Sequence, residues 1–222
     1  MKILFEDESI LVIDKPSGLL SIVDGYDSSL PHLRSILEHV YGKLWIIHRL
    51  DKETSGVVVL ARNAHAHQIL NDQFSNRAIQ KEYRALVFGT FPQTLNVSFQ
   101  LRINADRRHR TRVDPIIGKP SSTDFSLIEN IHNSAAYISA SPHTGYTHQI
   151  RAHLLSAGFP ILGDPLYNSA ASRQFSKDLP IQRTALHAYQ ITFIHPLSGE
   201  LITFHAEIPL DMQESLEFLN KN

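Results

Sequence analysis

The chain has 222 residues, of which 42% are hydrophobic and 19% are charged, and its formal net charge is −1. This composition allows a sizeable globular core, and the balanced charge argues against a protein that binds nucleic acid through a general basic excess. The absence of cysteine excludes disulfides, thiolate metal sites and cysteine nucleophiles. No apolar run approaches the ~20 residues of a membrane span, and early acidic residues interrupt any signal-peptide core, so we expect a cytoplasmic protein.

Runs of apolar residues predict a series of short strands. These runs are rich in β-branched and aromatic types and are separated by polar or turn residues, a pattern typical of strands. The strands are expected at residues 3–5, 10–13, 45–47, 57–60, 81–88, 95–101, 124–128, 135–140, 190–194 and 201–205. The last two flank a Gly-containing loop and indicate a hairpin.

Helical spacing predicts helices over 33–40, 66–74, 148–157 and a short C-terminal segment. Pro31 suits the first turn of the first helix, and Asn63 can cap the second. Gly158 stands where the third helix needs a glycine to end. Asp211, with Glu214 three residues on, predicts a capping box for the last helix. Since there is no repeat, low-complexity tract or linker, we expect one α+β domain over residues 1–222.

The most informative segment is polar and lies between two predicted buried strands. It reads His48-Arg49-Leu50-Asp51-Lys52-Glu53-Thr54-Ser55-Gly56. A carboxylate beside cations is stabilised in its ionised form, which suits a nucleophile, and Thr-Ser-Gly turns the chain into the next strand. Judged by its spacing alone, the segment is more typical of an ordinary solvated loop than of a catalytic site.

Further motifs decide between these interpretations. They are Lys15-Pro16-Ser17-Gly18-Leu19-Leu20-Ser21, Lys81-Glu82-Tyr83-Arg84-Ala85, Thr147-His148-Gln149-Ile150-Arg151 and Gly163-Asp164-Pro165-Leu166-Tyr167. In this order, and with Asp51 between the first and second of them, the chain resembles the RluA family of RNA pseudouridine synthases. The resemblance runs from about residue 4 to residue 207, which is nearly the whole chain.

The resemblance implies an isomerase that converts specific uridines of structured ribosomal or transfer RNA into pseudouridine, with neither cofactor nor metal ion. It implies a mixed, mainly antiparallel sheet with flanking helices and a central catalytic cleft. An N-terminal S4 RNA-binding domain, which family members often carry, is not expected because the first motif begins at once. We expect structured RNA as the partner, no obligate protein partner, and a monomer.

The resemblance also assigns catalytic residues. It places Asp51 as the essential carboxylate, Arg151 as the basic residue that pairs with it, and Tyr83 as the tyrosine that packs on the target uracil. A phenol suits that last role because it offers a flat apolar face and a polar tip. The sequence leaves open whether Asp51 attacks the base, attacks the sugar or removes the C2′ proton.

Substrate contacts are expected from a second set of residues. In relatives, the arginine that matches Arg49 enters the space left by the flipped uridine, where a planar cation can stack and form hydrogen bonds. We also expect His48 and Leu154 to contact the substrate. Arg107 and Arg108 belong to a basic stretch over 102–119 and are expected to contact phosphate, although a solvated loop is an equal alternative.

One position departs from the family pattern. Tyr146 stands where the family usually has the arginine of Thr-Gly-Arg. If that arginine touches phosphate, this chain loses one charged contact and gains a surface on which a base can stack. The departure affects the substrate contacts and leaves the reaction class unchanged.

Three alternatives compete with this interpretation. A catalytically silent RNA-binding module would have no use for Asp51, Tyr83 and Arg151 together. A hydrolase could use an Asp–His pair of Asp51 and His48, but the Gly-x-Ser-x-Gly motif is absent. A metal site is not expected, because histidines five apart on the predicted helix over 148–157 point in different directions.

Overall fold

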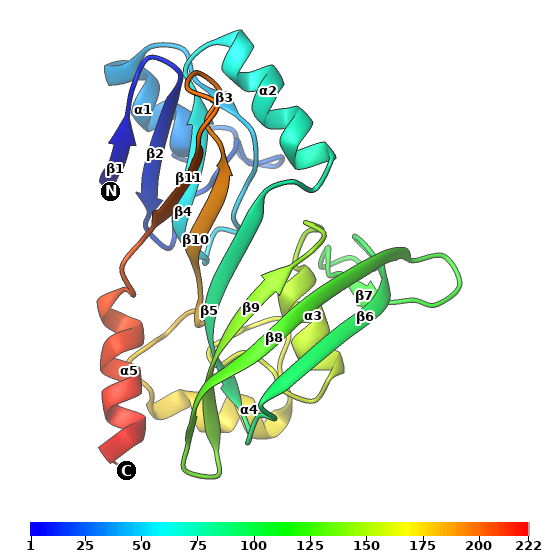
Figure 1. Cartoon of the computed structure of the whole chain (residues 1–222). Helices are drawn as coiled ribbons and strands as arrows, with labels where there is room; N and C mark the ends of the chain where they lie inside the picture. The colour runs from blue at the N-terminus through cyan, green and yellow to red at the C-terminus, as the bar shows by residue number, and fades with distance from the viewer. Residues whose placement is uncertain (222) are drawn as a thin grey trace. The chain divides into compact units, whose positions relative to one another are not determined.

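The computed structural model describes residues 1–221, and the chain divides into two compact units (Figure 1). Unit 1 comprises Met1–Lys81 and Ala188–Glu207. Unit 2 comprises Glu82–His187 and the C-terminal segment from Ile208. The architecture is α+β, as predicted.

Unit 1 is a sheet flanked by two helices. Its strands are β1 (Lys2–Glu6), β2 (Ile10–Lys15), β3 (Trp45–Ile46), β4 (Ser55–Ala61), most of β10 (Leu186–Ile194) and β11 (Leu201–His205). Their order is β1-β2-β4-β10, with β3 paired to β4 and β11 to β10. Every residue of β4 is buried, which explains its continuous apolar run. The helices are α1 (Leu33–Tyr41) and α2 (Ala64–Ser75), and α2 packs on β3 and β4.

The N-termini of α1 and α2 can be compared with the predictions made for Pro31 and Asn63. Asn63 caps α2 as predicted, because its side-chain oxygen accepts a hydrogen bond from the Ala66 amide at 2.8 Å. The position expected of Pro31 is wrong, since His32 is the N-cap of α1 and Pro31 precedes it. Pro31 therefore lies outside the helix, and the N-cap residue that follows it is extended.

Unit 2 is an antiparallel sheet covered by short helices. Its strands are most of β5 (Gln80–Phe88), β6 (Thr94–Arg102), β7 (Arg112–Val113), β8 (Lys119–Ile131) and β9 (Ala135–Pro142), in the order β5-β9-β8-β6-β7. The helices are α3 (Gln149–Ser156), α4 (Ala170–Phe175), the single 3-10 turn η1 (Ser176–Asp178) and α5 (Leu210–Lys221). α3 packs on β6, β7, β8 and β9 (Figure 1). Within residues 1–221, every helix is too short or too polar to cross a membrane.

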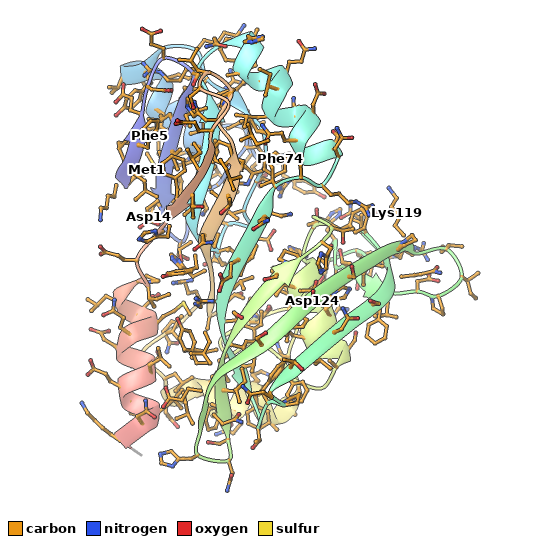
Figure 2. All side chains as sticks on the ribbon, viewed as in Figure 1. Met1, Phe5, Asp14, Phe74, Lys119 and Asp124 are labelled. Atoms are coloured by element: carbon orange, nitrogen blue, oxygen red, sulfur yellow. The ribbon has the colours of Figure 1, made fainter. Side chains whose placement is uncertain are left out.

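β8 is much longer than the strand predicted at 124–128. It continues to Lys119 at its outer end (Figure 2), and Lys119 pairs with Leu101 of β6. The additional residues, Pro-Ser-Ser-Thr, carry no apolar alternation, so their side chains gave no strand signal. Backbone hydrogen bonds to β6 hold them in the sheet.

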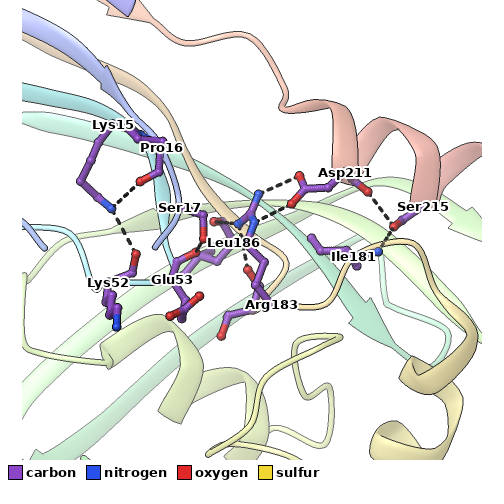
Figure 3. Close-up of polar contacts among 11 residues, drawn as sticks. Lys15, Pro16, Ser17, Lys52, Glu53, Ile181, Arg183, Leu186, Asp211 and Ser215 are labelled. Carbon is purple, nitrogen blue, oxygen red and sulfur yellow. Dashed lines mark hydrogen bonds and ion pairs between the residues drawn. The ribbon is translucent and has the colours of Figure 1, made fainter. Parts of the chain in front are cut away.

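The predicted cap of the last helix is wrong. α5 begins at Leu210, which places Asp211 inside the first turn. The Asp211 carboxylate accepts hydrogen bonds from Arg183 Nε at 2.7 Å and Nη2 at 2.9 Å, so it ties the helix to the chain before β10 (Figure 3). A long-range ion pair therefore takes the place of the expected local capping box.

Candidate functional site

Asp51 lies in the tight turn that leads from β3 into β4. The Thr54 amide donates to the Asp51 carbonyl at 3.1 Å and closes the turn. The segment ends at Gly56, whose φ is +115°. A Cβ at Gly56 would lie 2.2 Å from the Ala188 carbonyl oxygen, so only glycine fits here. The Thr-Ser-Gly ending therefore has a steric cause in unit 1.

The buried Lys15 ammonium stabilises this turn through hydrogen bonds to backbone carbonyls. Lys15 is fully buried, and its Nζ donates to the carbonyls of Pro16 at 2.9 Å and Lys52 at 3.2 Å (Figure 3). It also donates to the Leu19 carbonyl at 2.8 Å. The Gly18 amide donates to the same Lys52 carbonyl at 2.9 Å. An ammonium carries three donors, so these carbonyls match its full capacity. The N-terminal motif is thereby fixed to the residue that follows Asp51.

Two serines of the same N-terminal motif hold the backbone on both sides of Asp51. Ser17 Oγ donates to the Glu53 carbonyl at 2.9 Å. Ser21 Oγ donates to the Leu50 carbonyl at 2.8 Å and accepts from the Leu50 amide at 3.1 Å. Because the backbone is fixed before and after it, Asp51 is presented from a rigid support, as a preorganised catalytic group requires.

We predict that Lys15→Met destabilises unit 1 and lowers turnover. The change removes the ammonium donor from three partly buried carbonyls, of which the Lys52 carbonyl keeps the Gly18 amide. Each of the other two that is left unsatisfied costs ~1–3 kcal/mol, so we expect the free energy of unfolding to fall by roughly 2 kcal/mol or more, as measured by urea denaturation. Lys2→Met is the matched control, because Lys2 is exposed and should change stability by less than about 0.5 kcal/mol. Equal stability and turnover of both variants would contradict the role of Lys15.

His48 supports the turn, and Arg49 points outward. His48 Nε2 accepts a hydrogen bond from the Val59 amide at 3.0 Å, and its ring stacks on Phe74 (Figure 2) at 4.9 Å between centroids. Burial, with the Lys81 ammonium as a smaller cause, lowers the pKa of His48 to about 3. His48 is therefore neutral near pH 7, and its contacts with Val59 and Phe74 fix the ring within unit 1. Arg49, the next residue, is exposed.

These contacts bear on the competing chemistries. An imidazole whose Nε2 already accepts from a backbone amide, and whose pKa is about 3, is a poor general base at neutral pH. This weakens the hydrolase alternative that pairs His48 with Asp51. Within residues 1–221, no three His, Cys, Asp or Glu side chains gather in a way that could hold a metal ion.

In unit 2, Arg151 is locked by a carboxylate to which the sequence assigned no role. Arg151 Nε donates to Asp164 Oδ2 at 2.6 Å and Nη2 donates to Oδ1 at 2.9 Å, with side-chain exposures of 6% and 0%. Asp164 Oδ1 also accepts from the amides of Leu166 at 2.8 Å and Tyr167 at 2.9 Å. Such a bidentate pair fixes the plane of the guanidinium. Asp164 belongs to the Gly-Asp-Pro-Leu-Tyr motif, which was the signal available for it.

A directional chain of hydrogen bonds anchors α3 to the sheet of unit 2. Gln149 Nε2 donates to Thr123 Oγ1 at 3.1 Å, and Thr123 Oγ1 lies 2.9 Å from His153 Nδ1. Ser121 Oγ donates to the Phe99 carbonyl at 2.6 Å and lies 2.9 Å from His153 Nε2. Since that serine proton is committed, His153 must donate from Nε2 and accept at Nδ1. The neutral imidazole satisfies every group in the chain.

We predict that His153 makes the stability of unit 2 depend on pH. Burial lowers the pKa of this fully buried imidazole to about 4, below its unfolded value of 6.5. The unfolded chain therefore binds the proton first, and the stabilisation present above pH 6.5 is lost as the pH falls toward 4, by about 3 kcal/mol in total. Urea unfolding of the wild type and of His153→Gln between pH 7 and pH 4 measures this loss. Parallel pH dependences of the two proteins would contradict it.

The three residues that we expect to be catalytic divide between the units. Asp51 belongs to unit 1, whereas Tyr83 and Arg151 belong to unit 2. Tyr83 lies on β5 opposite Ala140 of β9, half-buried against the apolar core of unit 2. Leu154 is fully buried in that same core, which leaves none of its side chain exposed to a ligand. The expected contact between Leu154 and substrate stays a prediction.

The basic stretch is organised around Asp106. Its carboxylate accepts from the Arg108 amide at 2.9 Å and from Arg110 Nε at 2.8 Å, and it forms an ion pair with Arg112 Nη2 at 2.9 Å. Although desolvation acts in the opposite direction, the hydrogen bonds from Arg110 and Arg108 and the charge of Arg110 lower the pKa of Asp106 to about 2. Arg110 and Arg112 are thus compensated, and the side chains of Arg107 and Arg108 are left exposed on a structured loop.

Tyr146 lies in the turn that starts α3. Its amide donates to Gln149 Oε1 at 3.2 Å, and Lys119 Nζ (Figure 2) stands 5.9 Å from the centre of its ring. The ring is half-buried. A positive charge over an aromatic face is a favourable arrangement. The departure from the family arginine thus keeps a cation, Lys119, at this place.

Known proteins share this sequence and architecture. Residues 9–156 match the family model described as RNA pseudouridylate synthase. The chain is 38% identical to ribosomal large subunit pseudouridine synthase D of Zymomonas mobilis, over 96% of this chain and 71% of that protein. It is 33% identical to dual-specificity RNA pseudouridine synthase RluA of Haemophilus influenzae, over 93% of each. The structure of human RNA pseudouridylate synthase domain containing 1 superposes with a TM-score of 0.76 at 25% identity, covering 93% of this chain and 82% of that one.

Proposed function

The chain belongs to the family of RNA pseudouridylate synthases, and we propose that it acts on uridines of folded ribosomal or transfer RNA, with Asp51 as the essential carboxylate. The names of two relatives, one for the large ribosomal subunit and one for dual specificity, support these substrates. The single observation that carries the role of Asp51 is the bracing of its turn by Lys15, Ser17 and Ser21.

The reaction of this enzyme class rearranges one nucleoside without change of composition. The bond between N1 and C1′ breaks, the uracil turns, and a bond between C5 and C1′ forms. C5 loses its proton and N1 gains one, so the product is an isomer and no oxidant or reductant is consumed. In our proposal the Asp51 carboxylate makes the essential contact with the base or the sugar.

Other residues hold the substrate in this proposal. Arg151 supplies a fixed positive charge to the site, supported by its bidentate pair with Asp164. Tyr83 offers the ring on which the target uracil packs, a contact of ~1–3 kcal/mol. Arg49 fills the gap left by the flipped uridine, supported by its exposure beside the fixed His48. His48 holds the turn through the Val59 amide, and a contact between His48 and RNA stays a prediction.

The remaining expectations concern the domain organisation, the oligomeric state and the localisation of the protein. We propose that both units form one catalytic domain, since residues of both match the family motifs. We propose further that the protein acts as a monomer in the cytoplasm and needs no protein partner. Sedimentation of the purified chain with and without RNA tests the monomer.

Mapping of the product tests the proposed function. Ribosomal and transfer RNA from a strain that lacks the protein is incubated with purified wild type, labelled with carbodiimide and read by reverse transcription. A new stop at a defined uridine is the expected result, and the RNA in which it occurs identifies the substrate. Tight RNA binding without any new stop would overturn the proposal in favour of the silent RNA-binding module.

A further inference from the structure

Unit 2 contains a basic pocket of 530 Å³ that the catalytic roles do not use. Distant segments form its walls, namely the loop before β7, the motif around Asp164, and α4 with η1. Four cations line it, Arg108, Arg110, Arg173 and Lys177, against the single carboxylate of Asp164. Because Asp164 is paired with Arg151, the pocket carries a net positive charge.

Three of these cations are available to a ligand. Arg110 is compensated by Asp106, at 2.8 Å. The side chains of Arg108, Arg173 and Lys177 are exposed, and over residues 1–221 no carboxylate lies at ion-pair distance from them. Arg108 is separated from the other two by more than sixty positions in the sequence, so the fold brings these charges together. Converging cations of this kind fit a phosphate group.

The rest of the lining indicates which part of a nucleic acid fits. Among the described lining residues there is no Phe, Tyr, Trp or His, so the pocket offers no aromatic platform for a base. Its other residues are short polar side chains such as Asn168 and Ser172 and a few aliphatic ones. The chemistry therefore favours the sugar–phosphate backbone over a nucleobase, and contacts of this kind position an RNA without reading its sequence.

The pocket is joined to the helix that carries Arg151. Thr111, at the end of the basic loop, donates from its amide to Tyr167 Oη and from Oγ1 to the Thr147 carbonyl at 2.6 Å. Tyr167 follows Asp164, which both lines the pocket and holds Arg151. A phosphate bound here is thus held by the same part of unit 2 that orients Arg151.

We propose that this pocket binds a backbone phosphate of the RNA substrate, through Arg108, Arg173 and Lys177. The inference rests on the proposed function, since the substrate RNA supplies the phosphate. It adds Arg173 and Lys177, which lie outside all the sequence motifs, to the RNA-binding surface.

The test compares Arg173→Ala/Lys177→Ala with the wild type. Filter binding of unfractionated transfer RNA from the strain that lacks the protein is measured between 50 and 200 mM KCl. Losing the contact with this phosphate should weaken binding by roughly 10-fold at 100 mM salt and reduce the slope of log K against log salt by about 0.7 to 0.9. Lys2→Ala/Lys221→Ala removes the same charge from exposed side chains outside the pocket and should bind like the wild type.

The outcomes separate the pocket from the reaction. Unchanged affinity and salt slope in the pocket variant, while the wild type forms pseudouridine, would overturn the pocket and leave the proposed function intact. If RNA affinity is weakened in the pocket variant but the wild type forms no pseudouridine, the result would support the pocket and overturn the proposed reaction. A parallel titration with inorganic phosphate distinguishes the source, because binding of free phosphate with unaltered RNA affinity would assign the pocket to a free anion and overturn the proposal.

Discussion

Replacing Asp164 with alanine should destabilise the protein by about 3–5 kcal/mol and abolish turnover, because it leaves a buried charge without its partner. The Asp164 carboxylate is fully buried and accepts from Arg151 Nε and Nη2 and from the amides of Leu166 and Tyr167. Alanine removes all of these acceptors at once. The Arg151 guanidinium then loses the contact that fixes its plane, and the chain around Tyr167 loses its turn.

Urea denaturation and single-turnover kinetics measure the two effects. Asp164→Asn keeps the size of the side chain and one oxygen that can accept from the Leu166 and Tyr167 amides, while it removes the charge and one acceptor from Arg151. In that variant we expect the rate at saturating RNA to fall while RNA affinity stays near that of the wild type, since Asp164 acts through Arg151. Glu217→Ala is the control, because Glu217 is an exposed carboxylate on α5. A stable, active Asp164→Ala protein would contradict this role.

Local signals in the sequence were sufficient for most elements of the fold. The side chain of Asn63 caps α2 within three residues, and Gly158, with φ of +90°, ends α3 as predicted. β4 could be predicted because it is buried on both faces and its apolar run, residues 57–60, contains three valines. In each of these cases the residues that decide the structure are neighbours in the sequence.

Long-range partners account for what the sequence could not predict. The outer half of β8 is polar and is held by its pairing with β6. Asp211 resembles a cap, yet its carboxylate binds Arg183, which is 28 residues away. At the site, the sequence indicated Asp51 and Arg151, but it could not show that Lys15 braces the turn of Asp51 or that Asp164 locks Arg151. Such roles depend on which segments the fold brings together.

The largest loss of activity is expected from Asp51→Asn. Asparagine has nearly the same shape, so the change removes the charge of the carboxylate and little else. The brace of the turn acts on backbone atoms of Leu50, Lys52 and Glu53, which the substitution leaves in place. We therefore expect turnover to fall by roughly 10⁴-fold or more, a loss typical of an essential nucleophile, while urea stability and RNA affinity stay close to those of the wild type.

The most direct measurement uses RNA labelled with tritium at C5 of uridine. Formation of the bond between C5 and C1′ releases that hydrogen to water, so the tritium released counts each conversion. The account predicts stoichiometric release by the wild type at defined uridines, and none above background by Asp51→Asn at equal RNA occupancy. Release by Asp51→Asn at a rate near that of the wild type would contradict Asp51 as the essential carboxylate.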